Sequence, residues 1–291
     1  MGSEMCIRDS PSGWNVALRE YKGDAIIKVD AHAVIPEDFV SKNVRVLETG
    51  EYICGGQRPN IIDKPTPFKE TLLLAESSMF GSSIASYRNN PGKTYVKSLF
   101  HAAYRREVFE KVGFFNEELV RTEDNEIHYR MRKAGYKLCF DPDIISYQYT
   151  RSSLKAMLKQ KYANGYWIGK TSKVCPKCLS IYHFVPFAFV SAIIASGSVI
   201  GATGLAECIK KRHNHTLGKG ISALRKVTVV LTTVMWVLYA LMASGMAAVS
   251  AFKAEDKRNI TNACLPVLFL LLHLSYGIGL SLIHISEPTR P

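Results

Sequence analysis

The sequence predicts an α/β domain followed by membrane-spanning helices, and two observations support this fold class. Within residues 11–183, short apolar segments of strand character alternate with amphipathic segments of helical character. Within residues 184–279, long apolar runs dominate, so the mean hydropathy of +0.01 averages two very different regions. Alternating strands and helices indicate a sheet covered by helices, and an apolar helix of about 20 residues spans a bilayer.

The first part of the α/β region is expected to contain two helices and two strands. A Lys-Gly pair ends the first helix. Pro36 precedes the second, where proline is tolerated because the first turn of a helix does not use the N–H that it lacks. The expected elements are a helix over 13–21, a strand over 24–29, a helix over 39–49 and a strand over 52–54 that leads into Gly55-Gly56.

The second part is expected to contain three helices and a further strand. Gly113 and Gly135 each follow a helix, since glycine readily takes the backbone conformation that ends one. The expected elements are a helix over 68–79, a polar loop over 82–95, helices over 105–112 and 123–134, and a strand over 136–140 that ends at Asp141-Pro142. Ligands of such sheets bind beyond the carboxyl ends of the strands, and Asp30 and His32 follow such an end.

Three apolar runs without Asp, Glu, Lys or Arg predict membrane spans. They cover residues 184–206, 227–252 and 263–279. For the first run, a helix that lies in the interface or re-enters the membrane is the alternative. Basic residues before the first span and after the second outnumber those between the first two spans, so the positive-inside rule favours a cytoplasmic α/β domain.

The two ends of the chain have an unusual origin in common. Residues 5–10 and 280–285 can be encoded by the two complementary strands of one oligonucleotide, as expected of a sequencing adapter. We therefore expect residues 1–10 and 280–291 to be artefacts, and the remainder to be a fragment of a longer reading frame. The alternative is a natural terminus at each end.

Charge and cysteine content limit the classes of function. The net charge of +12 does not indicate nucleic-acid binding, because the sequence shows neither a known module nor a basic groove with interleaved aromatics. Basic residues beside the apolar runs instead favour contact with anionic lipid headgroups, and a bound diphosphate would use one or two of them. Cys175 and Cys178 supply two of the four ligands of a structural zinc site, which is a weak signal.

Two acidic signatures carry the chemistry. Asp30-Ala31-His32 follows an apolar strand, and a carboxylate with an imidazole suits a divalent metal that holds a nucleotide diphosphate. Glu123 and Asp124 open a helix, where a carboxylate pair suits a general base. Each has a plainer alternative: a polar turn that closes a strand, and acids that oppose a helix dipole.

These motifs together resemble family 2 glycosyltransferases. The resemblance rests on Gly-Asp-Ala-Ile-Ile-Lys-Val-Asp-Ala-His (23–32), Tyr-Arg-Arg-Glu-Val-Phe (104–109), Val-Gly-Phe-Phe (112–115), Thr-Glu-Asp (122–124) and Arg-Met-Arg-Lys-Ala-Gly-Tyr (130–136). It covers roughly residues 12–280 and is strongest to the membrane-anchored subgroup that builds bacterial exopolysaccharides such as succinoglycan. It implies an α/β fold of GT-A (Rossmann-like) type, a mixed sheet with flanking helices. That fold would be incomplete here over residues 11–183, because its first strand–helix units are missing.

The resemblance also assigns roles to individual residues. Asp30 and His32 match the motif that binds the metal, Mn²⁺ or Mg²⁺, and the nucleotide sugar. Asp124 matches the catalytic base, and Glu123 would orient the acceptor or hold Asp124. Glu126 is expected to be only a first-turn acid.

Residues for the acceptor are less clearly marked. We expect His101, Arg105 and Arg106 to lie on the acceptor side, with a structural histidine and a covered helix face as the alternatives. Gln160 and Trp167 stand where processive relatives carry Gln-x-x-Arg-Trp, but the spacing differs and the arginine is absent. This departure puts processivity in doubt and leaves an interfacial aromatic as the plainer reading of Trp167.

The sequence therefore predicts an inverting, metal-dependent glycosyltransferase of the hexosyltransferase type in the bacterial plasma membrane. The expected donor is a nucleotide-diphosphate sugar, most simply a UDP-sugar, and the expected acceptor is lipid-linked or a polysaccharide. The fragment itself is expected to be inactive, and specificity is expected in the missing units and in residues 82–95. A processive synthase and a non-catalytic assembly subunit of the membrane are the alternatives.

Overall fold

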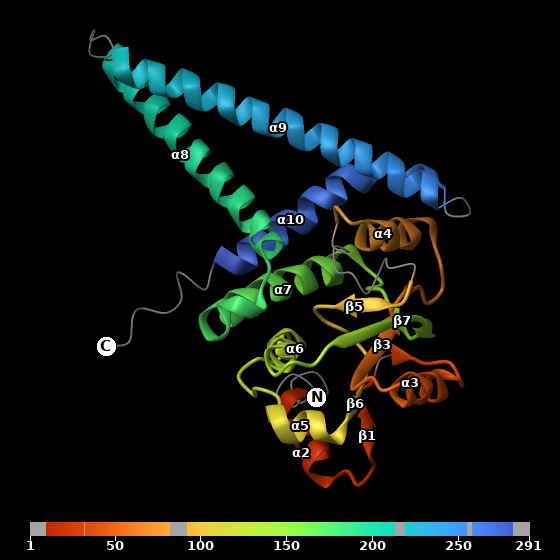
Figure 1. The fold of residues 1–291 in the computed structure, drawn as a ribbon. Helices are drawn as coiled ribbons and strands as arrows, with labels where there is room; N and C mark the ends of the chain where they lie inside the picture. The colour runs from red at the N-terminus through yellow and green to blue at the C-terminus, as the bar shows by residue number, and fades with distance from the viewer. Residues whose placement is uncertain (1–9, 32, 82–91, 213–218, 255–257, 282–291) are drawn as a thin grey trace, which may run out of the picture.

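A computed structural model describes residues 10–31, 33–81, 92–212, 219–254 and 258–281 (Figure 1). Its α/β part holds a five-stranded sheet in the order β1-β6-β3-β7-β5. β1 (Ala25–Ile27), β3 (Ile53–Gln57) and β7 (Leu138–Ile145) run parallel to one another. β6 (Ala102–Arg105) and β5 (Thr94–Val96) run antiparallel to them. The carboxyl ends of three strands therefore meet at one edge of the sheet.

Helices cover both faces of this sheet, as the consecutive buried residues of its central strands require. On one face, Ile53, Tyr104 and Phe140 pack against α2 (Ser10–Glu20), α5 (Arg106–Val112) and α6 (Glu123–Lys133). On the other face, Cys54, Ala103 and Cys139 pack against α3 (Phe39–Glu48). Neighbouring residues in each strand point to opposite faces, so each strand serves both layers.

A smaller sheet lies beside the first. β2 (Ala33–Val34) pairs antiparallel with β8 (Tyr147–Tyr149), which pairs parallel with β4 (Asn60–Ile61). Its members are two or three residues long, and the sequence patterns did not predict them. Such short strands lack the run of alternating residues on which strand prediction depends.

The predicted strand over 136–140 is wrong at its end. β7 starts at Leu138 and continues through Pro142 to Ile145, and the register between β3 and β7 shifts between Gly55 and Gln57. Gly56 makes the irregularity possible, because a Cβ there would collide with the carbonyl oxygens of Asp141 and Ile144. The proline thus falls at a bulge, where the ladder does not need its missing N–H.

The strand predicted over 52–54 also continues further, through the Gly55-Gly56 pair to Gln57. The helix predicted over 105–112 begins one residue later, at Arg106, because Arg105 still pairs with Ala25 in the sheet. The sequence patterns did not predict β6, which precedes that helix. Most of the predicted polar loop, residues 82–91, lies outside the described residues.

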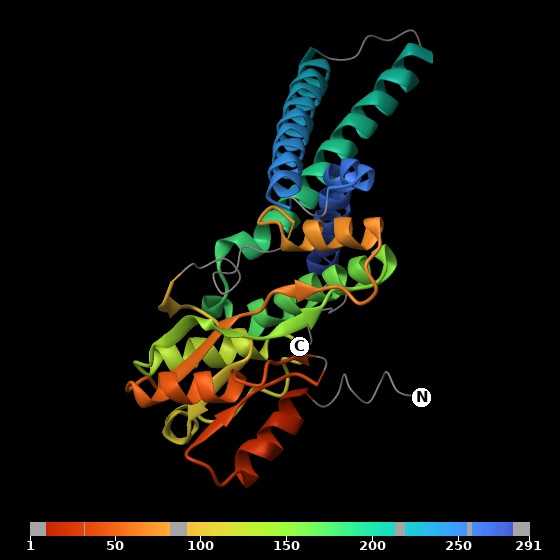
Figure 2. The same cartoon turned by 90° about the vertical axis from the view of Figure 1, so that its right-hand side faces the viewer.

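Three helices are long and apolar enough to cross a membrane, within Ile181–Ile209, Gly220–Lys253 and Ile260–Ser281. The predicted fold class, a mixed sheet with flanking helices followed by apolar helices, is confirmed. α8 (Val185–Arg212) and α9 (Lys219–Lys253) project from the α/β part as a hairpin (Figure 2). Only 6% of the most apolar stretch of each helix is buried inside the protein, which leaves an exposed apolar surface of the kind that marks a membrane or protein interface.

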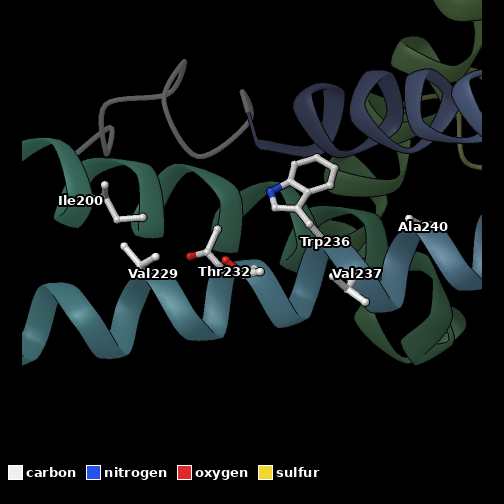
Figure 3. A pocket seen from close by; sticks show the side chains of 7 residues that line it. Ile200, Val229, Thr232, Trp236, Val237 and Ala240 are labelled. Carbon is white, nitrogen blue, oxygen red and sulfur yellow. The ribbon is translucent and has the colours of Figure 1, made fainter.

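Two of these elements form an open apolar groove. It lies between α8 and α9 and is lined by Ile200, Val229, Thr232, Thr233, Trp236, Val237 and Ala240 (Figure 3). The groove belongs to the long apolar helices and not to the α/β part.

α10 (Leu265–Ser281) joins the two parts. It packs along α7 (Leu154–Val174), against α4 (Pro67–Ser77) and against α8 (Figure 1). The backbones approach closely because a Cβ at Gly165 of α7 would collide with Tyr276, and one at Gly279 of α10 with Tyr162. Small residues permit such close helix packing. Phe269 and Leu272 of α10 share a core with Leu72 of α4 and Met157 of α7, so the α/β domain is held against the spans.

Candidate active site

The end of β1 supplies the first part of the candidate site. Lys28 continues the ladder for one residue, as its N–H donates to the Ala102 carbonyl at 2.9 Å. Asp30 then lies in a turn, in which its carbonyl oxygen accepts a hydrogen bond from the N–H of Ala33, also at 2.9 Å. His32 lies outside the described residues. The strand thus delivers Lys28 and Asp30 to the edge where the carboxyl ends of the parallel strands meet.

The start of α6 supplies the second part. Thr122 precedes the helix, and Glu123 and Asp124 occupy its first turn. The positive end of a helix dipole favours carboxylates at this position. The Thr122 hydroxyl contacts the Thr171 hydroxyl of α7, so the helix start is fixed against the element that packs on α10.

Lys28 connects the two parts. Its Nζ lies 2.6 Å from Asp124 Oδ1 and 3.5 Å from Glu123 Oε1, and its side chain is only 6% exposed. The rings of Trp14 and Phe115 each have their centroid 5.6 Å from this ammonium. A buried cation therefore lies between two aromatic walls and two carboxylates.

Burial and mutual repulsion shift the pKa values of the two acids. Loss of solvent, followed by the charge of Asp124, raises the pKa of Glu123 to about 7, although Lys28 opposes the shift. Loss of solvent also raises the pKa of Asp124, and again Lys28 opposes it. The charge of Asp30 raises the pKa of both carboxyl groups further. The structure thus brings Asp30, Glu123 and Asp124 together in one electrostatic neighbourhood.

His101 belongs to the same neighbourhood. Its Nδ1 lies 2.8 Å from the Ser146 hydroxyl, and its Nε2 lies 3.8 Å from Asp30 Oδ2. Within the described part of the chain, this buried Nε2 has no hydrogen-bond partner, and neither has Glu123 Oε2. Buried polar atoms without partners are rare in proteins and call for an explanation, of which function is one.

Arg105 and Arg106 are not at this site, so the expectation that they face the acceptor does not fit the structure. Arg105 donates to the backbone carbonyls of Glu51 and Leu47, and Arg106 to those of Gly23 and Tyr21. Both lie at the opposite edge of the sheet, because β6 runs antiparallel to β1 and pairs Arg105 with Ala25. The sequence shows two consecutive arginines after a strand, but it does not show at which edge of the sheet that strand ends.

α7 carries Gln160 and Trp167. The Trp167 carbonyl accepts from the Thr171 hydroxyl, which also contacts Thr122, so this tryptophan stands one helical turn from the start of α6. Its indole packs edge-on against Tyr166 at a centroid distance of 5.9 Å. Gln160 lies two turns earlier, and its buried Oε1 has no hydrogen-bond partner among the residues described. Trp167 is thus adjacent to the site, whereas no contact ties Gln160 to Asp30 or Asp124 within the described ranges.

The donor atoms at the site fit a divalent cation only in part. Asp30 offers carboxylate oxygens on a side chain that is 24% exposed, beside the unpaired His101 nitrogen. Carboxylate and imidazole are the ligand types that Mn²⁺ takes. Among the described residues, which leave out His32, no three His, Cys, Asp or Glu side chains gather as a metal-binding group. Asp30 could supply one ligand, but the described residues do not complete a metal-binding set.

Lys28 was not among the site residues predicted from the sequence. The signal was available, because a lysine interrupts the apolar run Ala-Ile-Ile-Lys-Val before Asp30. Lysine is almost never fully buried unless it is paired. A buried strand with one lysine therefore predicts an acidic partner, which the structure shows to be the α6 pair.

Comparison with known proteins identifies a matching family model and several relatives. The family model "Glycosyl transferase family group 2" matches residues 25–282. The succinoglycan biosynthesis protein ExoA of Rhizobium meliloti is 27% identical over 49% of this chain and 43% of its own length. The O-antigen chain rhamnosyltransferase RfbN of Salmonella typhimurium is 29% identical over 44% of this chain and 42% of its own.

An archaeal relative is similar over a longer stretch. The dolichyl N-acetyl-alpha-D-glucosaminyl phosphate 3-beta-D-2,3-diacetamido-2,3-dideoxy-beta-D-glucuronosyltransferase of Methanococcus voltae is 24% identical over 62% of this chain and 57% of its own length. The chain thus spans about half the length of the curated relatives it matches. Two of these names record the transferred sugar, and the two sugars differ, so the likeness indicates the reaction class and not the sugar.

Proposed function

Because the chain belongs to glycosyl transferase family group 2, we propose that it transfers a sugar from a nucleotide-diphosphate donor with inversion at the anomeric carbon. The acceptor is lipid-linked or a polysaccharide and is met at the membrane surface. One observation carries the proposal: Asp124 at the start of α6 pairs with the buried Lys28, two residues before Asp30, and burial, together with the charge of Asp30, raises the pKa of the Asp124 carboxyl.

In this proposal Asp124 is the general base. The acceptor hydroxyl attacks the anomeric carbon from the face opposite the diphosphate, the bond from that carbon to the diphosphate oxygen breaks, and the hydroxyl proton passes to Asp124. A base must be within hydrogen-bond reach of the proton it removes, and the Asp124 side chain is 18% exposed, so it can meet an acceptor. Glu123 orients the acceptor or holds Asp124.

Asp30, with His32, is the ligand pair for the donor's divalent cation, Mn²⁺ or Mg²⁺. Such a cation, when bound, neutralises the negative charge that develops on the departing diphosphate. His101 positions the Asp30 carboxylate, and Trp167 of α7 lies on the acceptor side. We take a UDP-sugar as the donor class.

The place of the site relative to the spans supports a membrane-bound acceptor. α7 contacts the start of α6 through Thr171 and packs along α10 on another side. An acceptor anchored in lipid therefore needs to rise only across α7 to reach Asp124. We place the α/β domain on the cytoplasmic side of a bacterial plasma membrane, where nucleotide sugars are made.

The test is a donor screen on the complete reading frame that contains this chain, in membrane vesicles with Mn²⁺. UDP-, dTDP- and GDP-sugars are supplied one at a time, and released nucleoside diphosphate is measured with and without lipid extract as the acceptor. We expect one donor to release diphosphate in a manner that requires both the extract and the metal. Absence of acceptor-dependent release from every donor would argue against the proposal.

A further inference from the structure

Lys28 is the most unusual charged residue in the α/β domain. It follows β1 directly, and its ammonium lies 5.6 Å from the ring centroids of both Trp14 of α2 and Phe115 of the α5–α6 connection. The Asp124 and Glu123 carboxylates stand 2.6 and 3.5 Å from this ammonium, and its side chain is only 6% exposed. Lys28 is therefore a buried cation in contact with carboxylates and close to aromatic rings.

The contacts of Lys28 are directional. Nζ donates to Oδ1 of Asp124 at 2.6 Å, while Glu123 Oε1 stands further away at 3.5 Å. Among the described residues, the hydrogen bond to the Asp124 side chain comes from Lys28. A charge-assisted hydrogen bond of this length fixes the orientation of both partners. One oxygen of Asp124 is thus held, and the other remains for a further partner.

Stability alone is a weak reason for this arrangement. Buried ion pairs often contribute little net stability, because desolvation offsets the attraction between the charges. α6 is also anchored by other means, since Ile127 and Met131 are buried in the core and Arg130 donates to the carbonyls of Val112 and Phe114. The ion pair therefore does not explain the position of α6, but it does explain the orientation of its first acids.

We propose that Lys28 is a positioning residue for sugar transfer, which holds Asp124 Oδ1 so that Oδ2 is presented to the acceptor hydroxyl. It also separates the α6 carboxylates from Asp30, whose negative charge would otherwise repel them. The inference rests on the proposed function, because it requires Asp124 to act as the base. It assigns Lys28 to the acceptor side of the reaction and not to the donor diphosphate.

The main test compares Lys28→Met with wild type in the complete reading frame, using the donor that the screen selects. We expect kcat to fall about 100-fold, as for loss of a well-oriented base. The KM for the donor and the affinity for UDP with Mn²⁺, measured by calorimetry, stay within about threefold, since positioning acts on geometry at the reacting atoms. Lys28→Arg, which keeps the charge and a donor, recovers at least a tenth of the wild-type kcat.

Lys42 provides a matched control. Its ammonium also pairs with an aspartate, at 2.8 Å from Asp38 Oδ2, but on the exposed side of α3. Lys42→Met removes the same atoms without touching the site, and kcat stays at the wild-type value. If Lys28→Met lowers UDP affinity in proportion to kcat, Lys28 binds the donor and the inference is wrong.

Lys28→Met leaves two buried carboxylates without their cation and can impair folding, which a thermal melt in detergent detects. In that case Lys28→Met combined with Glu123→Gln removes one charge of each sign, and Glu123→Gln alone is its reference. We expect the double variant to fold and to turn over at least tenfold more slowly than the reference. Equal turnover would overturn the inference, and so would loss of folding in both lysine variants, which would make Lys28 a structural residue.

Asp124→Asn separates this inference from the proposed function. If Asp124→Asn keeps full transfer, the assignment of the base fails and the inference fails with it. If Asp124→Asn is inactive while folded Lys28→Met turns over like wild type, the inference fails alone.

Discussion

The two edges of the five-stranded sheet use basic side chains in opposite ways. At the edge where β1, β3 and β7 end, Lys28 pairs with the carboxylates of Glu123 and Asp124. At the other edge, Arg105 and Arg106 donate to backbone carbonyl oxygens. The first edge retains buried polar atoms without partners, at His101 Nε2 and Glu123 Oε2 among the described residues. The two arginines of the second edge thus stabilise the backbone through hydrogen bonds.

This difference shows how a charged residue can be assigned to a site or to the scaffold. A cation that donates to backbone carbonyls satisfies groups that the fold has left without partners, so its position is explained without a ligand. The other kind of cation lies among carboxylates whose pKa values are raised. These carboxylates are held close together although they repel one another, an arrangement typical of functional sites. We therefore expect the charged side chains at the first edge to lower stability while they support activity, and those at the second edge to contribute to stability alone.

The largest expected effect is at the first edge. Asp30→Asn keeps the shape of the side chain but removes the charge that holds a cation, so transfer should fall by at least about 100-fold. Calorimetry with UDP should show that Mn²⁺ no longer strengthens binding. Binding of UDP that still depends on Mn²⁺ as in wild type would remove Asp30 from the metal site.

Glu123→Gln should reveal the stability cost of the first edge. Burial, followed by the charge of Asp124, raises the pKa of Glu123 in the folded protein from 4.5 to about 7, so its contribution to stability is lost as pH rises between these values. At pH 8 the variant should therefore be more stable than wild type by about 1–3 kcal/mol, and at pH 4.5 the advantage should disappear. Chemical denaturation in detergent at both pH values measures this, and a constant difference would contradict the account.

His128 should give a pH dependence of the opposite sign. Burial lowers its pKa from 6.5 to about 3, and its ring nitrogens contact Ser98 and Tyr104, at 3.0 and 2.8 Å. Below pH 6.5 the unfolded chain binds a proton that the folded chain refuses, so stability falls as pH falls. Relative to His128→Asn, wild type should lose about 1.4 kcal/mol per pH unit between pH 6.5 and 5. Thermal melts of both proteins across this range provide the measurement, and parallel curves would contradict the assignment.

The smallest effect on transfer is expected at the second edge. Arg106→Gln removes the hydrogen bonds to Gly23 and Tyr21, which should lower the free energy of unfolding by about 1 kcal/mol. Transfer per folded molecule should stay within about twofold, because no reacting group is touched. A large loss of turnover in a folded variant would return Arg106 to the acceptor site and erase the contrast between the two edges.

The sequence predicted much of the fold and part of the candidate site. It predicted the alternation of strands and helices, the three apolar helices and the family, since these depend on periodic patterns and ordered motifs. It did not predict β2, β4 and β8, which are too short for a pattern, or the continuation of β7 past Pro142, which depends on a neighbouring glycine in another strand.

At the site, the proximity of Asp30 to Asp124 was expected from the resemblance, whereas the buried lysine that pairs with Asp124 was not. The placement of Arg105 and Arg106 followed from strand direction in β6, which no local motif encodes. The features that the sequence did not predict therefore depend on pairing between residues far apart in the chain.

The most direct measurement is turnover by Asp124→Asn in the complete reading frame, with the selected donor and lipid extract. The account predicts a fall of at least about 100-fold in kcat, together with unchanged affinity for UDP and Mn²⁺ and normal thermal stability. Turnover within tenfold of wild type would contradict it, because sugar transfer would then proceed without the carboxylate that Lys28 holds.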